Sequence, residues 1–237
     1  KKKTFWPPCK SILKLHLHRI HVYSIHIVMR QSLQRFSPRI HVVLLQPRIP
    51  NNTGQIGRSC LGFGNAALHL VGPLGFNITD ASVKRSGLDY WPRVDVRMHE
   101  NWREFRDGAL RDLSQTGRVV VVSKRAKYGT AALDEAQLFR DVDCNDSDAT
   151  LTMIYGNEVS GIEDTLVDDP NWIVGQTRLF IPMDTGEEVE DQPVEADVEG
   201  GGGGVRSFNL ATSVGIGLYE AGRQLRALQR EHGGGVV

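Results

Sequence analysis

Short, uninterrupted apolar runs recur along the chain and alternate with stretches that have the spacing of amphipathic helices. The runs are rich in β-branched residues and do not alternate with polar ones, which is typical of strands buried on both faces of a parallel sheet. We expect strands at residues 41–45, 67–71, 119–122, 149–155 and 177–181, and helices at residues 54–64, 100–110 and 210–231. The pattern therefore predicts an α/β fold, with a parallel sheet and helices on both faces.

Three turns that carry glycine or asparagine follow apolar runs. They are Asn-Thr-Gly at 52–54 with Arg58 close behind, residues 156–161, and Ser-Phe-Asn-Leu at 207–210. Ligands bind at the carboxyl ends of strands in open α/β sheets, so one site assembled from the three turns is predicted. The competing interpretations are that Ser and Asn only cap helices, and that Arg58 is a solvated charge rather than a phosphate ligand near a helix start.

Composition narrows the class of protein. A chain of 237 residues with 40% apolar content can bury a sizeable core. Cys9, Cys60 and Cys144 have no metal-ligand spacing, so neither a disulfide framework nor a metal site is expected. Apolar runs all fall short of the roughly 18 to 20 residues that span a bilayer, so we expect no transmembrane segment.

Charge is unevenly distributed although the formal net charge is zero, since no Asp or Glu precedes Asp80. Residues 1–38 are basic and have the composition of an organelle-targeting peptide, or else are non-native upstream sequence. The expected location is accordingly a mitochondrion or chloroplast if the peptide is genuine, and otherwise the cytoplasm. Residues 184–204 are acidic and glycine-rich, which predicts a disordered surface insertion.

Two bases and two aromatic residues lie together between the second and third predicted strands. Lys84 and Arg85 are suited to an RNA backbone, and Tyr90 to base stacking, although aromatic residues beside Pro92 can simply pack. Neither the dinucleotide-binding glycine fingerprint nor the phosphate-binding loop motif follows a strand, which argues against a nucleotide-binding α/β protein.

In this order the three turns resemble the motifs of the SpoU-type branch of the SPOUT RNA methyltransferases, with Ile181-Pro182-Met183 leading into the third. Gly87-Leu88-Asp89-Tyr90 also matches, and the likeness is to the tRNA (cytidine/uridine-34)-2′-O-methyltransferases, which methylate the wobble ribose. The methyltransferase domain would span residues 39–230. Asn157 stands where a proline is common and Ala211 where a serine is common, and the long insertion is a further departure.

The resemblance implies a parallel α/β domain with a deep trefoil knot at its C-terminal end, a rare exception to unknotted topology. It also implies S-adenosylmethionine as cofactor, a tRNA anticodon stem-loop as substrate, and a homodimer. Contacts to the cofactor would come from Val122, Gly156, Glu158, Ile181 and Ser207, catalytic contacts from Asn52, Arg58, Ser207 and Asn209, and contacts to RNA from Arg58, Lys84, Arg85, Tyr90 and Tyr219.

An arginine is a poor base because it stays protonated in essentially all proteins. Arg58 is therefore expected to hold the phosphate beside the target nucleotide and to lower the cost of alkoxide formation. Two other functions stay open at this point. One is 2′-O-methylation of another tRNA or rRNA position, and the other is an RNA-binding protein that keeps the fold without catalysis.

Overall fold

The computed structural model describes residues 39–64, 66–78, 90–123, 131–143, 146, 148–162, 177–183 and 207–232. Its centre is a seven-stranded sheet in the order β3-β2-β1-β6-β4-β7-β5, and every strand pairing in this part of the chain is parallel. The strands are β1 (Arg39–Leu45), β2 (Ala67–Val71), β3 (Val96–His99), β4 (Gly117–Val122), β5 (Ala131–Ala132), β6 (Thr150–Tyr155) and β7 (Thr177–Phe180).

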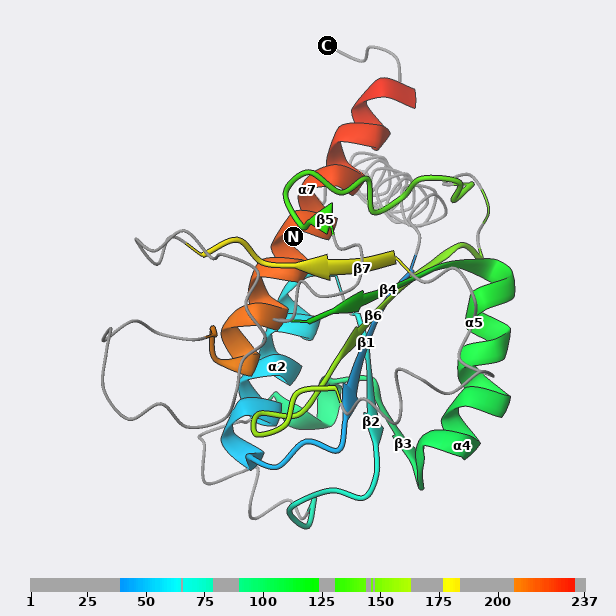
Figure 1. Ribbon diagram of the computed structural model, residues 1–237. Coiled ribbons are helices and arrows are strands. Elements are labelled where there is room, and N and C mark those ends of the chain that lie inside the picture. The colour runs from blue at the N-terminus through cyan, green and yellow to red at the C-terminus, as the bar shows by residue number, and fades with distance from the viewer. Residues whose placement is uncertain are drawn as a thin grey trace, which may run out of the picture.

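Helices cover both faces of this sheet, as predicted (Figure 1). On one side α2 (Pro50–Gly62) and the 23-residue α7 (Leu210–His232) pack against each other. On the other side α4 (Trp102–Phe105), the π-helical stretch η3 (Arg106–Leu110) and α5 (Arg111–Thr116) form one continuous rod. A short 3-10 turn, η2 (Trp91–Arg93), lies against α2.

Two apolar clusters fill the layers on either side of the sheet. Val42 and Leu44 of β1 point into the larger cluster beneath α2 and α7, and Val43 and Leu45 point into the smaller one beneath α4 and α5. Successive side chains of a strand face opposite sides, so a strand covered on both faces carries apolar residues at successive positions. Burial on both faces explains the uninterrupted runs in the sequence.

The first helix begins earlier than the sequence pattern suggests. The sequence pattern places the start of this helix at Gly54, with Asn52 or Thr53 as its cap, but α2 starts at Pro50 and its cap position, Ile49, makes no side-chain capping bond. Proline is well suited to the first helical position because its φ is already helical and its missing N–H would be unpaired there anyway. Asn52 and Thr53 therefore lie inside the first turn, and both are buried.

Glycine is costly inside a helix, so the glycines of α7 predict close packing of this helix against another element. This is confirmed at Gly217, where a Cβ atom would collide with the Tyr155 hydroxyl of β6. At Gly215 a Cβ atom would meet nothing within 4 Å, so packing inside the described part of the chain does not require glycine there.

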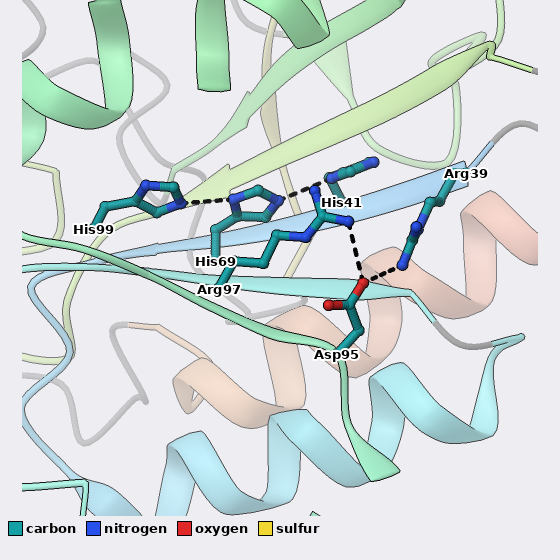
Figure 2. Close-up of polar contacts among 6 residues, drawn as sticks. All are labelled: Arg39, His41, His69, Asp95, Arg97 and His99. Carbon is teal, nitrogen blue, oxygen red and sulfur yellow. Dashed lines mark hydrogen bonds and ion pairs between the residues drawn. The ribbon is translucent and has the colours of Figure 1, made fainter. Parts of the chain in front are cut away.

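A row of three histidines crosses β1, β2 and β3 on the face covered by α4 (Figure 2). His41 Nδ1 lies 2.9 Å from His69 Nε2, and His69 Nδ1 lies 2.9 Å from His99 Nε2. His99 Nδ1 in turn lies 3.8 Å from a Glu104 carboxylate oxygen. Burial lowers the pKa of His41 to about 4 and that of His69 to about 2, with nearby positive charge adding to the effect. The row is therefore an uncharged chain of imidazoles inside the core.

Some predictions concern residues outside the described part of the chain. These residues are the basic segment 1–38, the candidate RNA contacts Lys84 and Arg85, and the insertion at 184–204. Within the described residues, no helix combines the length and the apolar character needed to cross a bilayer. The same part of the chain contains no group of three or more His, Cys, Asp or Glu residues arranged to hold a metal ion.

Candidate active site

The three turns meet at the carboxyl ends of β1 and β6, which are neighbours in the sheet. At their centre is Glu158, the second residue of the 157–161 turn that follows β6. Its Oε2 accepts a hydrogen bond from the backbone N–H of Arg48 at 2.8 Å, and its Oε1 accepts one from that of Ile49 at 3.2 Å. The carboxylate thus lies at the positively polarised start of α2, where a negative charge is stabilising.

Asn52 connects this carboxylate to the third turn. Its Nδ2 donates to Glu158 Oε1 at 3.1 Å, and its Oδ1 accepts from Asn209 Nδ2 at 3.1 Å. Asn209 Oδ1 also accepts from the backbone N–H of Ala211 at 2.8 Å and so caps α7. Glu158, Asn52 and Asn209 therefore form one hydrogen-bonded chain, which we call the carboxylate–amide chain, across all three turns.

The turn after β6 is held by its own asparagine. Asn157 Oδ1 accepts from the backbone N–H groups of Val159 and Ser160 at 2.9 and 2.7 Å. Gly161 has φ +70°, a conformation that favours glycine, and a Cβ atom on Gly156 would collide with the backbone of Gly161. Both glycines are thus needed to fold the turn tightly enough to present Glu158.

Arg58 and Tyr90, which the sequence suggested as separate RNA contacts, lie together. The Arg58 guanidinium carbon is 4.9 Å from the centroid of the Tyr90 ring. Arg58 is exposed, whereas Tyr90 is only 8% exposed and its hydroxyl donates to the Gly54 carbonyl at 3.2 Å. The charge therefore faces solvent above a buried aromatic ring.

The apolar residues expected to border a cofactor lie on adjacent strands. Val122 ends β4 and is buried, and Leu179 of β7 is its partner in register, so Ile181 leaves the sheet beside it. Ile181 and Ser207 are both half-buried. The role of these residues toward a cofactor stays a prediction.

Tyr219 lies apart from the other predicted residues. It is 57% exposed and makes an edge-to-face contact with Phe63 at 6.5 Å between ring centroids. It stands ten positions after Asn209, which corresponds to about 15 Å along the helix axis. An RNA contact by Tyr219 would therefore lie away from the carboxylate–amide chain of its own subunit.

Two features of this region escaped the sequence interpretation. One is the use of Glu158 as a distant cap for α2, since no local pattern links it to the backbone of Arg48 and Ile49. The other is the contact between Arg58 and Tyr90, which are 32 positions apart. The only signal for either was that all of these residues stand in or beside the quoted motifs.

Cys60, the cysteine in the described part of the chain, is not arranged for nucleophilic attack. Cys60 is fully buried in α2, and burial raises the pKa of its thiol to about 12. A thiolate is the reactive form of cysteine, so Cys60 is an inert core residue.

Comparison with known proteins gives matches over most of the chain. Residues 39–185 match the model of the SpoU rRNA Methylase family. A Synechocystis protein described as a candidate tRNA (cytidine(34)-2′-O)-methyltransferase is 36% identical over 195 residues, which cover 80% of this chain and 99% of that protein.

Solved structures give the same result. One from work on the 2-OH methylation of C/U34 on tRNA has a TM-score of 0.58 and 34% identity, covering 80% of this chain and 98% of that chain. The SpoU methyltransferase AviRb from Streptomyces viridochromogenes, solved in complex with AdoMet, has a TM-score of 0.53 over 81% of this chain and 61% of that one; at 20% identity it supports the fold alone. With the family model matched over most of the described domain, the chain belongs to the SpoU rRNA methylase family.

Proposed function

We propose that this protein transfers a methyl group from S-adenosylmethionine to the ribose 2′-oxygen of the wobble nucleotide, position 34, in a tRNA anticodon loop. The observation that carries the proposal is the carboxylate–amide chain of Glu158, Asn52 and Asn209, whose central member, Asn52, lies on the same helix as the exposed Arg58. These groups are suited to a hydroxyl and its neighbouring phosphate. Family membership and the C/U34 relatives support the reaction and the substrate class.

The ends of β4, β6 and β7 fit the cofactor that the family implies. Val122 at the end of β4 and Ile181 just after β7 would offer apolar side chains to the adenine ring, and the half-buried Ser207 would offer its hydroxyl to a polar part of the cofactor. When bound, the cofactor supplies an electrophilic methyl group on a sulfonium. Gly156 would border it through its backbone. Glu158 is already hydrogen-bonded to α2, so its proposed role is to hold that border in place.

Methyl transfer to a hydroxyl requires a fixed approach and removal of the hydroxyl proton. Positioning alone can supply much of the rate. Asn52 and Asn209 present amides whose orientation is set by their hydrogen bonds, and they fix the ribose. Arg58 binds the phosphate beside the target nucleotide and stabilises the developing alkoxide, and the proton passes to that phosphate or to water. Arginine itself stays protonated.

The test is methylation of unmodified tRNA with labelled cofactor, followed by mass spectrometry of the nucleosides. The expected product is a ribose-methylated pyrimidine at position 34. Arg58→Ala should lower turnover roughly a hundredfold, as loss of one preorganised charge-stabilising group does, while cofactor affinity by calorimetry stays unchanged. A methylated base, or wild-type turnover by Arg58→Ala, would contradict the proposal.

A homodimer and a C-terminal trefoil knot belong to the same proposal. The dimer is supported by Tyr219, a large aromatic side chain exposed on α7 beside Phe63, which would lie near the partner's active site. Mixing inactive Arg58→Ala and Tyr219→Ala proteins should restore some activity through hybrid dimers. A monomeric mass by light scattering at micromolar concentration, with no restored activity, would contradict it.

The proposal extends to segments outside the described residues. Lys84 and Arg85 would contact the RNA backbone on the approach to Tyr90. Residues 39–230 would form the methyltransferase domain, with 184–204 as a surface insertion, and the basic residues 1–38 would direct the protein to an organelle if they belong to the native chain. A fluorescent fusion of residues 1–38, located by microscopy, tests the last point.

A further inference from the structure

The segment around η2 contacts α2 at two points that are about one helical turn apart. The Tyr90 hydroxyl donates to the Gly54 carbonyl at 3.2 Å. At Gly57 a Cβ atom would come within 2.6 Å of Trp91 Cζ3, so the indole lies directly on the helix backbone. Gly54 and Gly57 are both buried by this contact. Tyr90 is thus fixed against the helix that carries Arg58.

The Arg58 guanidinium lies over the face of this fixed ring, 4.9 Å from its centroid. A cation is attracted to the electron-rich face of an aromatic ring, and the attraction is larger where water is partly excluded. A guanidinium held in this way keeps in-plane N–H donors for a phosphate, because the ring occupies only its flat face. The contact therefore selects one orientation of a long side chain without using up its donors.

We propose that Tyr90 is a positioning residue for methyl transfer, and that its ring holds Arg58 in the orientation that meets the substrate phosphate. The inference rests on the proposed function, in which Arg58 binds that phosphate. A free arginine side chain samples many rotamers, and ordering it in advance lowers the cost of binding and of transition-state stabilisation. Tyr90 is buried, which argues against direct stacking of its ring on an RNA base. The experiments below distinguish base stacking from the positioning role.

Two substitutions separate the ring from the hydroxyl. Tyr90→Leu removes the ring and should lower kcat/KM for tRNA roughly tenfold, on the scale of one partly buried cation–π contact, while cofactor affinity is unchanged. Tyr90→Phe keeps the ring, loses the hydroxyl with its bond to Gly54, and should recover most of the lost activity. Phe105→Leu is a matched control, because it removes a buried aromatic ring on the opposite face of the sheet and should lower the melting temperature without lowering kcat/KM.

A series of fluorinated phenylalanines at position 90 provides the decisive measurement. Successive fluorine atoms weaken the negative face of the ring at nearly constant shape, so single-turnover rates should fall stepwise with fluorination. The same series in an Arg58→Ala background should show no dependence. A flat series in the native background would overturn the inference.

The remaining outcomes are equally distinct. A fluorination effect that persists in Arg58→Ala would also overturn the inference and would indicate that Tyr90 contacts RNA directly. Native activity in Arg58→Ala would instead refute the role of Arg58 in the proposed function, whatever the series at position 90 shows.

Discussion

The side chain of Asn209 serves two partners at once. Its oxygen caps α7 by accepting from Ala211, and its nitrogen donates to Asn52. The sequence pattern left capping and ligand contact as alternatives, and the structure shows a cap that is also joined to the carboxylate–amide chain. One substitution can separate the two roles.

Asn209→Asp keeps the capping oxygen and adds a negative charge at the start of α7, which is favourable there. It removes the N–H that Asn52 Oδ1 accepts, so two oxygens face each other. Rotating the Asn52 amide only moves the mismatch to Glu158 Oε1. We therefore expect stability within about 1 kcal/mol of the native protein, but at least a roughly tenfold loss of kcat/KM.

Chemical denaturation and methyl-transfer kinetics measure the two effects. Asn209→Ala is the comparison, because it loses both the cap and the donor and should fall in stability as well as in activity. Native activity in Asn209→Asp would contradict a role for the carboxylate–amide chain.

The sequence predicts which residues belong to the site, but not which hydrogen bonds connect them. Asn52, Arg58, Glu158 and Asn209 were all singled out because each stands in a turn after an apolar run. Which atoms bind which is decided by the packing of β1 against β6, more than a hundred positions apart in sequence. Local patterns contain no information about such a register, so the support that Glu158 gives to α2 could not be foreseen.

Among the secondary-structure elements, the interior strands were predictable and the edges were not. All five expected strands are present, because burial on both faces leaves a continuous apolar run. β3 lies at the edge of the sheet, reads Val-Arg-Met-His and is only partly buried, and β5 has two residues. Neither produces a clear pattern. The early start of α2 is not evident from the sequence pattern, because Pro47 and Pro50 together indicate an extended exit from β1 rather than a first helical residue.

The histidine row makes the β1–β2–β3 side of the sheet sensitive to acid. Folding lowers the pKa of His41 and His69 below the unfolded value of about 6.5, so the unfolded chain binds more protons at low pH. The stability contributed by neutral imidazoles is therefore complete above pH 6.5 and is lost as pH falls toward 4. Each histidine contributes a slope of up to about 1.4 kcal/mol per pH unit in this window.

Urea denaturation between pH 7.5 and pH 5 should accordingly show a steep fall in the free energy of unfolding. His69→Gln keeps a donor and an acceptor for the neighbouring rings but does not titrate, so its slope should be shallower. Equal slopes for the two proteins would mean that the row does not govern acid stability.

For the molecule as a whole, the order of the strands is what assembles the site. The chain runs outward from β1 to β2 and β3, then returns beyond β6 to β4, so β6 lies where the direction of winding reverses. Ligands of open α/β sheets bind outside the carboxyl ends of the strands at such a switch point. The turn that carries Glu158 follows β6 at this point, and it lies next to the segment that joins β1 to α2. The predicted fold class thus implied the position of the site, although not the strand order that creates it.

Methyl transfer to a ribose oxygen can be tested directly with one substrate. An anticodon stem-loop with a single 2′-deoxy substitution at the wobble nucleotide keeps the base and the flanking phosphates but lacks the acceptor oxygen. This RNA should bind as the all-ribose version does and accept no labelled methyl group, while the all-ribose version is methylated. Methyl transfer to the deoxy-substituted RNA at an undiminished rate would rule out the ribose 2′-oxygen of the wobble nucleotide as the acceptor.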